Sequence, residues 1–194
     1  SNLPTVASED GNTSTVAPLL GTAFLILFLE AGLTYWMPSL LAKTSDNELI
    51  GASYMAAFFG WFVVVRLAAA ALATWITTLG FALIGLGGVL ASLLFVSTGF
   101  IPLSETSFIG AFMGLIFPNA YAWMLMTGHG GTALGAKLLL SAITGATLGP
   151  WLLGWIWPIF GDVAVLLTLA SASALSMAIM LRTYLRTRKM LVID

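Results

Sequence analysis

Two residues of opposite charge lie inside long apolar stretches of the chain. Glu30 is near the centre of one stretch, at about 18–41, and Arg66 is near the centre of the next, at about 50–74. A charged side chain at the middle of a bilayer costs about 2.5–3.5 kcal/mol, so it usually faces a protein interior or a wet cavity and finds a partner. Consecutive spans run antiparallel, which would bring Arg66 within roughly 5 Å of Glu30 in depth. The two charges therefore predict a polar pathway or a buried ion pair.

Each charge has a functional and a structural interpretation. Glu30 shares a helical face with Thr34 and could bind a solute or carry a coupling proton, or it could be a structural carboxylate that is protonated or paired. Arg66 could be a gate or a solute clamp, or a tether that snorkels or caps the end of a neighbouring helix. Tyr35 is expected to reach the cavity, and Trp36 to lie at the membrane interface.

A proline interrupts the apolar stretch at 106–126, in the run GLIFPNAYAW. Pro118 lacks an N–H and clashes with the carbonyl of Gly114, so it predicts a kink. Asn119 follows directly and shares a face with Trp123, which is typical either of a bend that lines a cavity or of a plain structural kink. Tyr121 and Trp123 could stack on a sugar, although aromatic residues inside spans more often serve packing.

The composition is that of a membrane protein. The chain has 194 residues, of which 59% are hydrophobic and 8% charged, whereas soluble domains have about 25% charged residues. With no cysteine and one histidine, His129, the chain offers no disulfide, no thiolate chemistry and a poor basis for a zinc site. No HExxH, P-loop or GxGxxG motif is present. We therefore expect no enzyme activity, no cofactor, no metal and no nucleic-acid partner.

Hydrophobic runs and turn residues predict an all-α membrane protein with six transmembrane helices. The predicted spans lie at about 18–41, 50–74, 79–97, 106–126, 133–157 and 162–183. Gly145 and Gly149 form a pair of small residues four apart, which predicts close helix packing.

Lysine and arginine predict the orientation. A basic cluster follows the last span, which places the C-terminus in the cytoplasm; it consists of Arg182, Arg186, Arg188 and Lys189. Counting back over six spans places the N-terminus there too. The chain is thus divided into a polar cytoplasmic linker at 1–16, a transmembrane domain at 17–184 and a basic cytoplasmic tail at 185–194. The polar start without a Met is expected of a piece cut from a longer protein.

Four stretches carry motifs of a known family: LEAGLTYWMPSLL at 29–41, GASYMAAFFGWFVVVRLAAAAL at 51–72, GLIFPNAYAW at 114–123 and GATLGPWLLGWI at 145–156. On these, the chain resembles the C-terminal six-helix half of a major facilitator superfamily transporter, and within it the fucose-permease-like sugar porters. It departs from the family pattern at Val65, where a glycine usually precedes the arginine, and in the uncharged TWITTLG stretch, where a charged loop is usual.

The resemblance implies half of a twelve-helix fold, built as two inverted three-helix repeats. It implies a secondary active transporter for a small polar solute, possibly a sugar, and possibly a proton symporter, with the N-terminal six-helix half as partner in the bilayer. Glu30 and Arg66 would line or lock the cavity, with secondary contacts from Thr34, Asn119 and Tyr121.

Two alternatives stay open. One is a six-helix membrane scaffold or receptor-like subunit that transports nothing and holds a structural pair of Glu30 and Arg66. The other is a homodimeric carrier that is complete as it stands.

Overall fold

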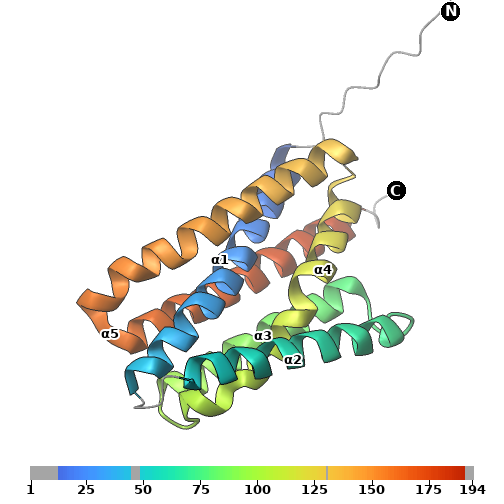
Figure 1. Cartoon of the computed structure of the whole chain (residues 1–194). Helices are drawn as coiled ribbons and strands as arrows, with labels where there is room; N and C mark the ends of the chain where they lie inside the picture. The colour runs from blue at the N-terminus through green and yellow to red at the C-terminus, as the bar shows by residue number, and fades with distance from the viewer. Residues whose placement is uncertain (1–12, 45–48, 130, 191–194) are drawn as a thin grey trace, which may run out of the picture.

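The computed structural model describes residues 13–44, 49–129 and 131–190, and among these the chain is helical with no β-strand (Figure 1). The helices are α1 (Thr13–Thr44), α2 (Ile50–Leu72), α3 (Thr78–Ser97), the short 3₁₀ helix η1 (Leu103–Phe108), α4 (Ile109–Gly128) and α5 (Thr132–Met190).

Five helical segments are long and apolar enough to cross a membrane: α1, α2, α3, η1 joined to α4, and α5. The expectation of an all-α, multi-pass membrane protein is confirmed at this level. The expected fifth and sixth spans correspond to one element, α5, in which two helices meet across a kink at Gly161.

The chain reverses direction within α5. Gly161 has φ 80° and ψ −175°, a conformation that glycine reaches without steric cost. Figure 1 shows α5 as two helical parts that lie side by side and run in opposite directions, and the turn between them is at Gly161. We call 132–160 the first arm and 162–190 the second arm of α5. The reversal falls where the sequence predicted a boundary, but no loop separates the arms.

The ends of the helices differ from the expected boundaries. α1 begins at Thr13, inside the segment expected to be a linker, and α5 extends to Met190, inside the expected tail. The other linker residues, 1–12, and the last tail residues, 191–194, lie outside the described residues, as do 45–48 of the predicted AKTSDNE loop.

The helices pack in defined pairs. α1 packs along both arms of α5, with Gly32 against Leu153 of the first arm and Leu169 of the second. α4 packs against both α2 and α3. α3 in turn packs against α5, where the Ser173 hydroxyl donates a 2.8 Å hydrogen bond to the Leu86 carbonyl. Figure 1 shows α1 beside the first arm of α5, and α4 beside α2.

Two pairs of glycines bring backbones into contact. On the first arm of α5, Gly145 and Gly149 lie against the main-chain carbonyls of Phe24 and Phe28 of α1. On α4, Gly110 and Gly114 lie in the same way against two carbonyls of α2. These belong to Phe58 and Phe62. Apolar surface gives little association energy between helices inside lipid, so close approach of this kind stabilises the bundle.

Candidate functional site

Glu30 has a buried carboxylate oxygen that no hydrogen bond satisfies. Its Oε2 atom is buried and has no partner among the described residues. The neighbouring Thr34 does not serve it, because the Thr34 hydroxyl donates a 2.9 Å hydrogen bond to the main-chain carbonyl of Glu30 instead. A buried charged group without a partner is costly in an apolar medium. Glu30 is therefore a buried polar side chain on α1 with an oxygen that can still accept a hydrogen bond.

Arg66 bonds to α4. Its Nε atom donates a 3.3 Å hydrogen bond to the carbonyl of Gly114, and its guanidinium lies 4.0 Å from the centre of the Phe62 ring. The Gly114 carbonyl would normally accept from the residue four positions later, which is Pro118 and has no N–H. Arg66 thus supplies the hydrogen bond that the kinked helix lacks.

The predicted ion pair between Glu30 and Arg66 is not formed, although the two charges still interact electrostatically. Pro38 of α1 packs against Gly51 of α2 and sets the register of the two helices. Counted from that contact, Glu30 and Arg66 differ in depth by about seven residues, roughly 10 Å at 1.5 Å per residue. This offset is larger than expected, and it leaves the guanidinium closer to α4 than to the carboxylate.

A cavity of about 240 Å³ lies beside Arg66, between α2 and α4. Its walls combine small side chains of α2 with the residues around Pro118 of α4: Arg66, Ala69, Ala70, Ala73, Gly114, Pro118 and Asn119. The Asn119 Nδ2 atom donates a 2.8 Å hydrogen bond to the Leu115 carbonyl. The structure therefore brings together Arg66 and Asn119, two of the predicted site residues, at one cavity.

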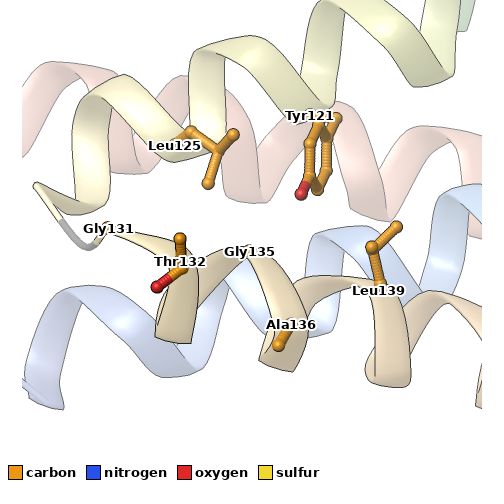
Figure 2. Close-up of a pocket in the computed structure, with 7 residues that line it drawn as sticks. All are labelled: Tyr121, Leu125, Gly131, Thr132, Gly135, Ala136 and Leu139. Atoms are coloured by element: carbon orange, nitrogen blue, oxygen red, sulfur yellow. The ribbon is translucent and has the colours of Figure 1, made fainter.

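Tyr121 lies in a different pocket. A hollow of about 620 Å³ separates the second half of α4 from the first turns of α5. Figure 2 shows Tyr121 and Leu125 on one side, facing Thr132, Ala136 and Leu139 on the other. The Tyr121 ring stacks on Phe117 with 5.8 Å between ring centres. Tyr121 does not share the cavity of Arg66.

The remaining aromatic residues of the predicted site are split between core and surface. Trp123 is only 7% exposed and belongs to the hydrophobic core. Tyr35 is 59% exposed, whereas Trp36, which was expected at the interface, is 7% exposed. The Trp36 indole packs inward, and its Nε1 atom donates a 3.1 Å hydrogen bond to the Pro150 carbonyl.

Sequence reasoning missed a polar cluster at the bend of α5. The Asp162 carboxylate accepts a 2.5 Å hydrogen bond from Trp157 Nε1 and pairs with Lys43 at 3.2 Å. Lys43 also lies 5.2 Å from the centre of the Trp157 ring, and Trp36 packs edge-on to the same ring at 4.7 Å. The sequence shows that Lys43 and Asp162, of opposite charge, lie at the ends of two predicted spans, but only the fold shows that the two side chains are in contact.

In the described parts of the chain, no group of three His, Asp or Glu residues could hold a metal ion. No protein-family model matches the chain, and no curated protein and no solved structure matches it either.

Proposed function

We propose that this chain is the C-terminal, six-span half of a secondary active transporter that moves a small polar solute, such as a sugar, by alternating access. The observation that carries the proposal is the pattern of helix pairs. Counting the two arms of α5 as the fifth and sixth spans, the main helix pairs among the first three spans and the last three have counterparts when the two sets are exchanged, which supports the proposal. Inverted three-helix repeats of this kind are typical of transporters.

The matched pairs can be followed one by one. α1 packed on the first arm of α5 corresponds to α4 packed on α2. Both contacts place glycines against phenylalanine carbonyls, although the glycines lie on the first arm in one contact and on α4 in the other. α1 packed on the second arm corresponds to α4 packed on α3. α3 packed on the second arm corresponds to itself. A scaffold has no need of this correspondence, whereas a duplicated transporter unit has it by construction.

The solute would meet the polar groups of α1, α2 and α4. Glu30 offers a carboxylate oxygen that has no hydrogen-bond donor. Arg66 uses its Nε–H for the Gly114 carbonyl, so the other N–H groups of its guanidinium can donate to a solute. Asn119 lines the cavity beside Arg66. Carboxylate, guanidinium and amide groups are suited to a solute rich in hydroxyls. We assign Glu30 as the residue that would carry a coupling proton.

The missing partner would be an N-terminal half in the same bilayer. In this arrangement both the start of α1 and the end of α5 lie in the cytoplasm, and each arm of α5 crosses the membrane once. Tyr35, which is exposed here, would face that half or the solute.

The coding sequence upstream of Ser1 is the first test. Six further hydrophobic spans there are expected. Their absence would contradict the half-transporter proposal and turn attention to cross-linking of a homodimer.

The second test is uptake of labelled sugars and other small polar solutes by cells that express the full-length protein. We expect Glu30→Gln, Arg66→Leu and the double variant each to lose uptake, while Glu105→Gln, at an exposed residue of η1, retains it. Protein at the membrane is quantified in parallel, so that loss of expression is distinguished from loss of transport.

The alternative is a scaffold that transports nothing. The bond from Arg66 to Gly114 favours it, because that bond is a structural tether between α2 and α4. In that case, the double variant Glu30→Gln with Arg66→Leu would still assemble with the partners of the protein as the wild type does.

A further inference from the structure

Glu30 and Arg66 are the charged residues within the apolar parts of the described helices. α3 and α4 carry no charged residue, and α5 carries none between Lys137 and Asp162. Arg66 is accordingly the charged group that acts on Glu30 from the helices packed around it. Each of the two is therefore the other's natural ionic partner, although they are not bonded to one another here.

Arg66 has two competing acceptors. One is the Gly114 carbonyl, which Pro118 deprives of its helical donor and which Arg66 occupies in the structure. The other is the Glu30 carboxylate, whose Oε2 atom is buried without a partner. A charge-assisted bond to a carboxylate is roughly twice as strong as a bond to a neutral acceptor. Ionised Glu30 would therefore draw the guanidinium away from α4, and neutral Glu30 would leave it there.

The surroundings of Arg66 permit this movement. The guanidinium already lies over the ring of Phe62, one helical turn from Arg66 toward the level of Glu30. The carbonyl next to Gly114 keeps a side-chain donor when Arg66 leaves, because Asn119 bonds to Leu115. Gly114 itself would lose its donor, and the local geometry of α4 at Pro118 would change to re-satisfy it.

We propose that Arg66 exchanges between the Gly114 carbonyl and the Glu30 carboxylate, so that the charge on Glu30 sets the bend of α4 at Pro118. Arg66 is then a positioning residue that links two helices of the proposed solute site. Protonation of Glu30, or a solute that donates to it, would favour the bond from Arg66 to Gly114 that is seen here. The inference rests on the proposed function for its use in transport, but its test needs no transported solute.

The test is a distance measurement between spin labels on the two helices. Cysteines replace Leu72 at the end of α2 and Met126 near the end of α4, both of which are exposed. This chain has no cysteine of its own, and any cysteine elsewhere in the full-length protein is replaced by serine. The protein is studied in lipid nanodiscs at pH 5 and pH 9, and correct folding of each variant is checked by its thermal unfolding.

We expect the wild type to gain a second distance population at pH 9, where ionised Glu30 recruits Arg66. Glu30→Gln should remove that population, whereas the control Glu105→Gln should retain it. Pro118→Ala restores an N–H for the Gly114 carbonyl, so it should abolish the difference between wild type and Glu30→Gln.

The proposal is overturned if wild type and Glu30→Gln give the same distances at both pH values, or if Pro118→Ala leaves their difference intact. Failure of the uptake assay with the distance changes intact would count against the proposed transport function alone. Uptake without any distance change would count against the exchange alone.

Discussion

Gly145 of α5 lies directly against the main-chain carbonyl of Phe24 in α1. A Cβ atom at position 145 would meet that oxygen at a distance that real atoms do not reach, and a Cβ at Gly149 would lie 2.8 Å from the Phe28 carbonyl. Backbone atoms cannot move aside as the end of a flexible side chain can. The two helices therefore depend on the absence of a side chain at these positions.

Replacement of Gly145 by alanine should destabilise the protein by about 1–3 kcal/mol, the usual cost of overpacking. The matched control is Gly87→Ala in α3, where a Cβ would have nothing within 4 Å. The control should be neutral or slightly stabilising, because alanine favours a helix over glycine by about 0.5–1 kcal/mol. Thermal unfolding in detergent, followed by tryptophan fluorescence, measures both. Equal midpoints for the two variants would contradict the packing described here.

The sequence predicted this contact in part. The spacing of Gly145 and Gly149 predicted close packing, and that is confirmed. It could not name α1 as the partner, because small residues permit approach without choosing the neighbour. The equivalent pair Gly110 and Gly114 carries the same signal and was not singled out.

The orientation of aromatic residues was harder to predict. α1 is apolar on all sides, so its sequence does not reveal which face points inward. Tyr35 and Trp36 are adjacent and thus project in different directions on the helix, so that Tyr35 is exposed and Trp36 is buried. The hydrogen bond from Trp36 to Pro150 joins residues far apart in the chain, so no local sequence pattern predicts it.

The bond between Arg66 and the kink can be tested by a double-mutant cycle. Arg66→Leu leaves the Gly114 carbonyl without its donor, which should cost about 1–3 kcal/mol. Pro118→Ala returns a helical N–H to that carbonyl, so the cost of Arg66→Leu should shrink in its presence. Contacting residues show coupling energies of about 0.5–3 kcal/mol in such cycles. Unfolding free energies of the four proteins give the coupling.

The control cycle combines Arg66→Leu with Pro38→Ala, at a proline of α1 that packs on Gly51 at the opposite end of α2. These two changes should be additive within about 0.5 kcal/mol. Additivity in the Pro118 cycle as well would mean that Arg66 does not replace the bond that Pro118 removes.

The site, too, was predictable in part. That Arg66 caps a neighbouring helix was one of the interpretations left open, and Pro118 marked the carbonyl that needed a donor. The ion pair with Glu30 was expected from depth alone, which ignores how two helices are offset. The contact of Pro38 with Gly51 sets that offset, and it is a property of packing.

The cluster at the bend of α5 contains a weak interaction, the ion pair of Lys43 and Asp162, and a stronger one, the hydrogen bond from Trp157 to Asp162. Lys43 and Asp162 form an ion pair whose side chains are 57% and 40% exposed. Lys43→Gln should therefore cost no more than about 1 kcal/mol, and less at high salt. Asp162→Ala should cost more, because it also removes the acceptor of Trp157 Nε1. Trp157→Phe tests that second contribution, and a cost for Lys43→Gln equal to that of Asp162→Ala would contradict it.

The two arms of α5 should each cross the membrane, and single cysteines can establish this because the chain has none of its own. Four exposed positions are replaced one at a time and treated with a membrane-impermeant maleimide: Ser104, His129, Phe160 and Arg186. Intact cells should label the first and third, which lie at the outer ends of the helices in the proposed orientation. Permeabilised cells should label all four, and the cysteine-free parent none.

Phe160 and Arg186 decide the outcome for α5, since they lie near the bend and near the end of the second arm. Labelling of both from the same side would mean that the second arm does not cross, and the six-span reading would fail. If intact cells label His129 and Arg186 instead of Ser104 and Phe160, the six crossings would stand. The orientation inferred from the basic C-terminal cluster would then be reversed.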